Sequence, residues 1–275
     1  MSHSKTLLLL GTGQLGKAVI ELSRGSRRII ASTRNPNRIF ELSDLGVEPL
    51  IMPLPSAEII ESVVAKADVL VSFPPDGTTD AILAPACAEA RSLVYISSTG
   101  VYGKQTGRID DSTPVDRADE RMRPRLEAES LWREHGAVVL RAPGIYGSES
   151  GLHKRLLEGT YKMPADGANF ISRIHVDDLA AIVLSIFESK AKLSDTTYLV
   201  GDEHPCTLAE IVGWLCRELE LPLPESVPMS EVNPSLRGNR AIDGSRILKE
   251  LGFALKYPDY REGYRSCISL VRGEA

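Results

Sequence analysis

Three glycines near the start of the chain have a spacing that suits phosphate binding. The sequence Gly11-Thr-Gly13-Gln-Leu-Gly16 follows an apolar run at 7–10 and precedes a helical pattern. In such a strand–turn–helix the first glycine permits a tight turn, the second lets the backbone approach a pyrophosphate, and the third lets the helix pack on the strand. The helix start also offers free N–H groups and a partial positive charge. We predict a dinucleotide site at Gly11, Gly13, Gln14, Leu15 and Gly16.

The residues after the second apolar run indicate which dinucleotide is preferred. An NAD site usually has an Asp or Glu there, which binds the ribose 2′-hydroxyl. This chain has Ser32-Thr33-Arg34, with Arg38 one helical turn later. A guanidinium offers a 2′-phosphate a planar, charge-assisted fork, whereas a carboxylate would repel it. The alternative is that both arginines are solvated loop charges. Because the glycine turn precedes them, we favour the binding role of the arginines, and so NADP(H) over NAD(H), with Ser32, Thr33, Arg34 and Arg38 as contacts.

Polar and small residues also follow the next expected strands, at the carboxyl edge where open parallel sheets bind ligands. Residues 72–75 read Ser-Phe-Pro-Pro, residues 97–103 read SSTGVYG, and residues 143–147 read PGIYG. Hydroxyl groups, glycines and a tyrosine suit a site for a flat ring and a polar substrate. We add Phe73, Pro74, Pro75 and Ser97 to the predicted cofactor contacts.

The elements that would position these residues alternate along the chain. Apolar runs predict strands at 6–10, 28–32, 47–52, 68–73, 92–97 and 137–141, and helical periodicity predicts helices at 14–24, 56–66, 78–90 and 121–135. Strands that alternate with helices predict right-handed crossovers and a parallel sheet. The expected fold class is α/β: a Rossmann-type doubly wound parallel sheet with a small C-terminal substrate lobe.

The sequence becomes more irregular after Arg141. A short helix is expected at 152–158, and further elements at 178–189, 196–200, 208–219 and 243–251. Asp177 or Asp178 is expected to cap the helix that follows His175. We predict a dinucleotide-binding Rossmann domain over 1–147 and a substrate-binding lobe over 148–275, with 170–200 returning to the Rossmann core. The lobe is too irregular to predict an independent domain.

Composition narrows the function classes. The chain has 275 residues, a formal net charge of −5 and ordinary apolar content, which is not the profile of a polybasic nucleic-acid or membrane binder. Its four scattered cysteines predict neither a disulfide framework nor a metal site. No apolar run approaches the roughly 18 residues that a membrane span needs. We expect a cytoplasmic protein with a small-molecule partner, and no nucleic-acid or membrane partner.

Several motifs occur together in an order that resembles a known family. VYISSTGVYG at 94–103, RAPGIYG at 141–147 and RIHVDDLA at 173–180 resemble the extended short-chain dehydrogenase/reductase superfamily, in its NAD(P)-dependent epimerase/dehydratase family. The tail at 239–264 is similar to an atypical, YeeZ-like bacterial branch. The resemblance implies that Ser98, with Thr99 as alternate, holds the reacting oxygen of the substrate. It also places Pro143, Ile145 and Tyr146 beside the nicotinamide.

The resemblance also implies an acid/base pair that this chain lacks. The family has a Tyr and, four residues later, a Lys, whereas counting back from Glu129 gives Arg121 and Arg125 at those positions. Arginine stays protonated and cannot exchange a proton near neutral pH. Arg125 could still bind the nicotinamide ribose. Proton transfer would then fall to another group, for which Tyr102 and Tyr146 are candidates; the alternative for each is a packed ring.

Two functional hypotheses follow. One is an NADP(H)-dependent oxidoreductase or epimerase/dehydratase acting on a small or nucleotide-linked carbonyl or hydroxyl compound, with Ser98, Tyr102 and Arg125 in the catalytic site. The other is an inactive NADP(H)-binding sensor or regulatory protein. The basic residues 153–155 could bind a substrate phosphate or carboxylate, or form a solvated face. Substrate, reaction direction and oligomeric state stay open, with a homodimer through 78–90 and 121–135 as one option.

Overall fold

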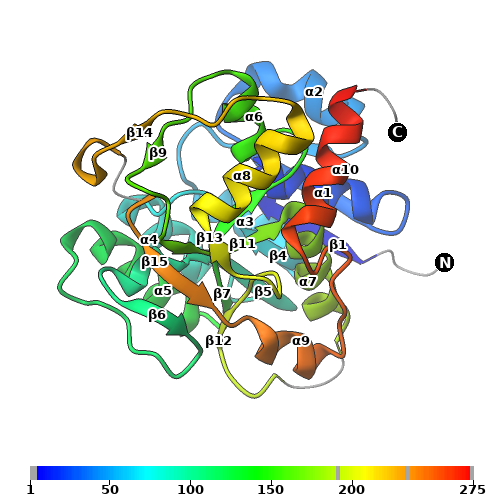
Figure 1. The fold of residues 1–275 in the computed structure, drawn as a ribbon. Coiled ribbons are helices and arrows are strands. Elements are labelled where there is room, and N and C mark those ends of the chain that lie inside the picture. Colours follow the sequence, from blue (N-terminus) through cyan, green and yellow to red (C-terminus); the bar gives the residue numbers. More distant parts are fainter. Residues whose placement is uncertain (1–4, 190–192, 233–235, 273–275) are drawn as a thin grey trace. The chain divides into compact units, whose positions relative to one another are not determined.

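The computed structural model describes residues 5–189, 193–232 and 236–272, and its central feature is a seven-stranded sheet (Figure 1). The strands, in the order β12-β7-β5-β4-β1-β2-β3, are Thr197–Leu199, Val138–Ala142, Ser92–Ser98, Asp68–Val71, Thr6–Leu10, Arg28–Thr33 and Glu48–Ile51. β1 pairs in parallel with both β2 and β4. Leu7, Leu8 and Leu9 are fully buried, as expected of a strand covered on both faces. The predicted α/β Rossmann-type fold is confirmed.

Helices connect these strands as the sequence predicts, with differences at particular residues. They are α1 (Gln14–Ser23), η1 (Pro36–Arg38), α2 (Ile39–Asp44), α3 (Ala57–Val64), α4 (Gly77–Ala86), η3 (Glu120–Met122), α5 (Arg123–Glu134) and α7 (Val176–Glu188). The short helix α2 was not expected. The helix predicted to start at 121 starts at Arg123, because Pro124 at its first turn favours a helix start there. Arg121 therefore lies in the preceding 3-10 turn.

The chain forms two compact units. The first unit comprises residues 1–98, 119–141 and 179–198, and the second unit comprises 99–118, 142–178 and 199–275. Segment 99–118, which the sequence analysis placed in the dinucleotide-binding domain, groups with the second unit. The first unit has a core in which Leu8, Val69 and Tyr95 are fully buried.

The second unit has a hydrophobic core of its own, which the irregular sequence did not indicate. Its helices are α6 (Leu152–Leu157), α8 (Leu208–Leu219), α9 (Ser245–Leu251) and α10 (Tyr260–Arg272), and its short strands are β6 (Thr106–Ile109), β8 (Gly144–Tyr146), β9 (Met163–Pro164), β10 (Phe170–Ile171), β11 (Arg173–His175), β13 (Cys206–Thr207), β14 (Ser226–Val227) and β15 (Asn239–Ile242). α8 and α10 lie side by side (Figure 1), with Trp214 edge-on to Tyr260 at 5.7 Å. Large buried aromatic side chains thus supply much of the core of this unit, whose strands are short. Within the described ranges, no helix has the length and apolar character needed to cross a bilayer.

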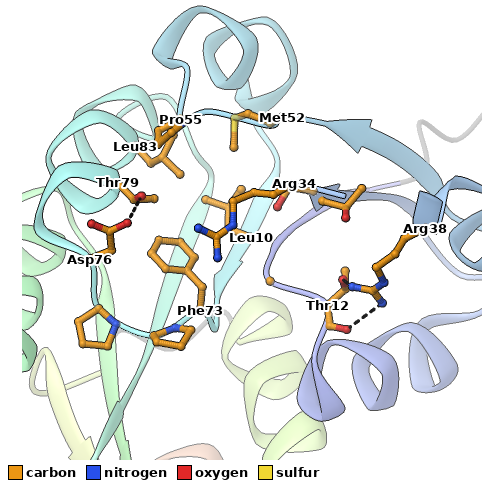
Figure 2. A pocket seen from close by; sticks show the side chains of 15 residues that line it. Leu10, Thr12, Arg34, Arg38, Met52, Pro55, Phe73, Asp76, Thr79 and Leu83 are labelled. Carbon is orange, nitrogen blue, oxygen red and sulfur yellow. Dashed lines mark hydrogen bonds between the residues drawn. The ribbon is translucent and has the colours of Figure 1, made fainter. Parts of the chain in front are cut away.

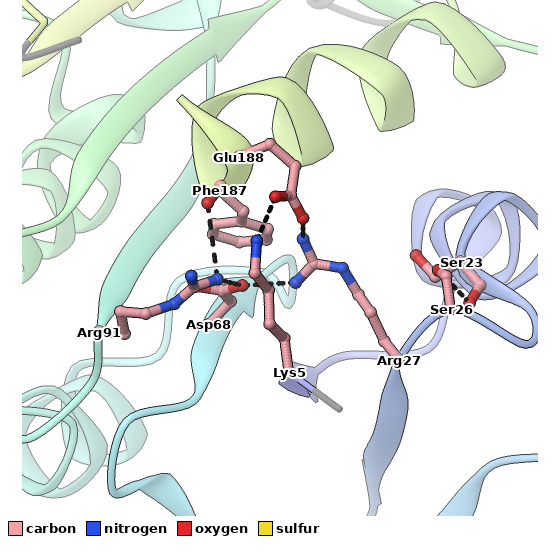
Figure 3. Close-up of polar contacts among 8 residues, drawn as sticks. All are labelled: Lys5, Ser23, Ser26, Arg27, Asp68, Arg91, Phe187 and Glu188. Atoms are coloured by element: carbon pink, nitrogen blue, oxygen red, sulfur yellow. Dashed lines mark hydrogen bonds and ion pairs between the residues drawn. The ribbon is translucent and has the colours of Figure 1, made fainter. Parts of the chain in front are cut away.

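A buried ion cluster joins the amino ends of several strands in the first unit (Figure 3). Asp68, the fully buried first residue of β4, accepts hydrogen bonds from Arg27, just before β2, and from Arg91, just before β5. Arg27 also pairs with Glu188 at the end of α7, as does Lys5 before β1. A buried carboxylate with two guanidinium partners is well compensated, whereas either partner left alone would be a costly buried charge.

We expect Asp68→Asn to lower the free energy of unfolding by about 3 kcal/mol, because the change leaves the buried Arg27 guanidinium without its anion. Urea denaturation measures the loss. The matched control is Glu48→Gln, which breaks the exposed pair between Arg28 and Glu48 and should cost less than about 1 kcal/mol. Equal losses in the two variants would contradict this account of the cluster.

Candidate functional site

A cavity of about 340 Å³ opens in the first unit at the carboxyl ends of β1, β2 and β4 (Figure 2). This is the edge at which ligands bind in open parallel sheets. Eight of the predicted cofactor contacts line it: Gly11, Ser32, Thr33, Arg34, Arg38, Phe73, Pro74 and Pro75. Three loops that are separate in the sequence therefore meet at one cavity.

The glycine turn beside this cavity has the geometry that a phosphate site needs. Gly11 has φ of +112°, and a Cβ there would lie 2.9 Å from Ser72 Oγ and 3.0 Å from the Phe73 nitrogen. A Cβ at Gly16 would lie 2.7 Å from the Gly11 carbonyl oxygen, whereas one at Gly13 would meet nothing within 4 Å. Gly11 and Gly16 thus allow close packing, and Gly13 leaves its side of the turn open. No side chain caps α1 at Gly13, so its first N–H groups can receive an anion.

The two arginines of the predicted nucleotide site differ in their partners. Arg38 donates to Thr12 Oγ1 at 2.7 Å and binds the Glu41 carboxylate through Nε at 2.9 Å and Nη2 at 3.1 Å. Arg38 is thus a clamp between the glycine turn and α2. Among the described residues, no hydrogen bond or ion pair occupies the exposed Arg34, whose side chain extends across the cavity toward Phe73 (Figure 2). Arg34 is therefore the cation available to a ligand.

Sequence reasoning missed part of the cavity wall. The further lining residues are Leu10, Thr12, Met52, Pro55, Asp76, Thr79 and Leu83. Asp76 accepts a hydrogen bond from the Thr79 hydroxyl at 2.7 Å, which together with the charge of Arg34 lowers the pKa of Asp76. Met52 and Pro55 follow β3, and their place at the end of the predicted strand 47–52 and just after it was the available signal. Their apolar surfaces, with Leu83, form a slot suited to a flat ring.

Ser97 and Ser98 end β5 in different environments. The buried Ser97 hydroxyl donates to Glu129 Oε1 at 2.6 Å, and Arg141 donates to both oxygens of Glu129 at 3.0 and 2.7 Å. Ser97 is thus part of a buried network between β5, α5 and β7. Ser98, the next residue, is only partly buried. The catalytic role of Ser98 and the cofactor contact of Ser97 stay predictions.

The two arginines that replace the expected acid/base pair also separate. Arg121 is exposed and holds Asp119 through Nε at 2.9 Å and Nη2 at 2.7 Å, closing a local turn. Arg125 is half-buried and donates to the Ile96 carbonyl at 3.4 Å, two residues before Ser98. Its charge also opposes the burial that raises the pKa of Tyr95. Arg125 therefore places a positive charge beside the end of β5. Arg121 is instead held by Asp119 in the turn before α5.

Tyr102 and Tyr146, the candidate proton donors, are both packed rings of the second unit. Tyr102 is 0% exposed and Tyr146 is 2% exposed. Tyr146 stacks on Tyr264 at 4.3 Å, and a Cβ at Gly263 would lie 2.0 Å from its hydroxyl. Burial raises the pKa of Tyr146 far above its usual range. Both tyrosines are thus packed rings, as the alternative interpretation predicted. The nicotinamide contacts of Pro143, Ile145 and Tyr146 stay predictions; these residues belong to the second unit, whereas the cavity described above lies in the first unit.

His175 has a structural role at the start of α7. Its Nδ1 accepts a hydrogen bond from the Asp177 N–H at 3.2 Å, and its Nε2 faces the Cys267 thiol at 3.6 Å. The expectation that Asp177 or Asp178 caps this helix is wrong for Asp178, whose carboxylate instead accepts from the N–H groups of Lys256 and Tyr257. Burial lowers the pKa of His175 to about 4 against the opposing charge of Asp177.

This lowered pKa makes folding pH-dependent. The unfolded chain protonates His175 near pH 6.5, so the stability present above that pH is lost as the pH falls toward 4. The contribution is up to roughly 3 kcal/mol. We expect His175→Gln to show a shallower fall in unfolding free energy than the unaltered protein between these limits, by urea denaturation at stepped pH. Parallel pH profiles would show that His175 is not responsible.

Comparison with known proteins gives relatives but no match to a family model. The chain is 27% identical over 180 residues to protein YeeZ of Escherichia coli K12, covering 61% of this chain and 59% of YeeZ. It is 28% identical over 213 residues to the 3-diazoavenalumate denitrifying reductase of a Streptomyces species, covering 68% of each chain. A solved structure from Methylobacillus flagellatus, provisionally assigned as an NAD-dependent epimerase/dehydratase, is 25% identical with a TM-score of 0.75, over 98% of this chain and 100% of that one.

Proposed function

Because this chain belongs to the epimerase/dehydratase family of the extended short-chain dehydrogenases/reductases, we propose that it is an NADP(H)-dependent oxidoreductase or epimerase/dehydratase. The names of its relatives, a reductase and an epimerase/dehydratase, support the proposal that it is an enzyme. The proposed substrate is a small or nucleotide-linked carbonyl or hydroxyl compound.

The observation that carries the NADP(H) proposal is the unpaired Arg34 at the cavity of the first unit. Gly11, Gly13 and the start of α1 would hold the pyrophosphate, and the slot at Met52, Pro55 and Leu83 would hold the adenine. Within this arrangement Arg34 offers a planar donor fork to a 2′-phosphate. Arg38 would act indirectly, because Thr12 and Glu41 already occupy most of its donors. When bound, the nucleotide would supply or accept a hydride.

We expect Arg34→Ala to weaken NADPH binding at least about tenfold and NADH binding by no more than about threefold, because only the former has a 2′-phosphate for a charged hydrogen bond. Fluorescence titration of both nucleotides measures this. Arg28→Ala, at the opposite end of the same strand and exposed, is the matched control and should change neither affinity. Equal affinity of the unaltered protein for NADPH and NADH would overturn the NADP(H) preference.

For the chemical step we propose that Ser98 holds the reacting oxygen and that Arg125 supplies positive charge beside it. Ser98 is partly buried at the end of β5, and Arg125 is hydrogen-bonded to Ile96 on the same strand. A fixed donor and a nearby cation stabilise negative charge that develops on an oxygen. The full burial of Tyr102 argues against direct proton transfer by its hydroxyl, so solvent would carry the proton.

Two substitutions that remove only a hydroxyl group separate these roles. We expect Ser98→Ala to lower kcat/KM by about 100-fold or more, as for loss of one oxyanion donor. Tyr102→Phe should change it by less than about tenfold. The assay is NADPH consumption in a screen of carbonyl compounds. A 100-fold loss in the Tyr102 variant would instead assign proton transfer to that tyrosine. NADPH binding without NADPH consumption would argue against a net reductase, and the absence of any converted product as well, by chromatography, would favour the sensor hypothesis over an epimerase or dehydratase that recycles its cofactor.

A further inference from the structure

The second unit contains a cavity of about 450 Å³ whose lining points to the class of compound it binds. Apolar and aromatic side chains form much of its wall, among them Ile145, Leu152, Ile171, Leu208 and Tyr264. Such a wall favours a compound with an apolar or aromatic body. Charged side chains from three segments also reach the cavity.

Arg173 on β11 is the unusual member of this lining. It is 5% exposed, and within the described residues no carboxylate oxygen lies within 4.0 Å of its guanidinium. Its Nη1 lacks a hydrogen-bond partner, although its guanidinium is hydrogen-bonded to the Tyr264 side chain, and the rings of Tyr260 and Tyr264 lie 5.8 and 6.0 Å away. A buried guanidinium is costly unless an anion accepts its hydrogen bonds. Arg173 is therefore a cation prepared for an anionic partner.

Asp202 is the acidic residue whose charge acts on Arg173, but it is not an ion-pair partner. Its backbone N–H donates to the Arg173 carbonyl at 2.8 Å, and its Oδ1 accepts from the His204 N–H at 3.3 Å. Its other oxygen has no hydrogen-bond partner. Burial raises the pKa of Asp202 to about 7 against the attraction of Arg173. The charges of the two side chains thus attract each other, but the side chains form no ion pair within 4.0 Å in the described residues.

The remaining charges of the cavity limit how much negative charge a ligand can bring. Lys154 and Arg155 on α6 are half-buried and form no ion pair in the described ranges, and Arg155 lies over the Tyr161 ring at 4.9 Å. Glu149 and Glu158 line the same cavity. Among the side chains that line the cavity, three cations and two anions leave at most one positive charge, because Asp202, which acts on Arg173 from outside the lining, can only reduce it. A single carboxylate balances it, whereas a diphosphate would bring excess negative charge.

We propose that this cavity binds a small compound with one carboxylate and an apolar or aromatic body, and that Arg173 receives the carboxylate. A guanidinium binds a carboxylate through two parallel hydrogen bonds, which fixes the orientation of the ligand. The proposal rests on the proposed function only in identifying this compound as the substrate. It narrows the substrate class to carboxylic acids and disfavours nucleotide-linked compounds.

The test is calorimetric titration of the protein, without NADP(H), with cinnamate and its neutral isostere cinnamamide, followed by titration of UDP in the presence and absence of saturating cinnamate to show whether the two compete. We expect cinnamate to bind at least about tenfold more tightly than cinnamamide and UDP, because only cinnamate pairs one carboxylate with an apolar body. Equal binding of cinnamate and cinnamamide, displacement of cinnamate by UDP that binds more tightly, or no binding of cinnamate at millimolar concentration would overturn the proposal. These outcomes need no variant that might fail to fold.

Variants then assign the contact. Arg173→Gln should lose the preference for cinnamate over cinnamamide, and Arg173→Lys should lose most of it, because an ammonium lacks the planar fork. Arg108→Ala, at an exposed arginine of the same unit that pairs with Asp243, should leave it unchanged. If folded Arg173→Gln keeps the full preference, Arg173 is not the receptor. Failure of NADPH to bind while cinnamate binding persists would overturn the proposed function alone.

Discussion

The buried carboxylate of Asp68 is the constraint on which the cavity of the first unit depends. It holds Arg27 and Arg91, and through Arg27 also Glu188, where neighbouring strands begin. Fixing the amino ends of β1, β2, β4 and β5 at one level sets where their carboxyl ends emerge, because parallel neighbours keep their register along the sheet. The cavity formed by the loops after β1, β2 and β4 lies at that other edge. The ion cluster thus lies at the amino edge of the sheet, and the cavity lies at its carboxyl edge.

The arginines of this chain show how partners decide function. Arg121, Arg38 and Arg141 are all held by carboxylates, at Asp119, Glu41 and Glu129. Their charges organise turns and helices. Arg34 and Arg173 lack such a partner in the described parts of the chain, and each lines a cavity. A guanidinium without a carboxylate partner in the protein can bind the anion of a ligand. Arg34 and Arg173 are therefore the proposed contacts of the cofactor and of the substrate.

The fold of the first unit could be predicted because its signals are local. The apolar run that forms β1, the glycine turn and the helix that follows are contiguous, and two local features, the positive φ of Gly11 and the closeness of Gly16 to the Gly11 carbonyl, favour glycine at both positions. In the second unit the helices α6, α8 and α9 were predicted from the sequence, but its strands and core could not be predicted in this way. Its short strands and its aromatic core, with Tyr146 stacked on Tyr264, bring together residues more than 100 positions apart, and no local period records such contacts.

The sequence by itself determined the glycine turn, the parallel sheet and the absence of the Tyr and Lys that the family resemblance implies. Only the tertiary structure decided which of the suggested side chains are available. Tyr102 and Tyr146 are buried, and Ser97 is hydrogen-bonded to Glu129. Arg38 is hydrogen-bonded to Thr12 and Glu41, whereas Arg34 lines its cavity without such a partner among the described residues. The physical reason is that hydrogen bonding and burial depend on neighbours distant in the chain, whereas backbone geometry at a glycine depends on the residues beside it.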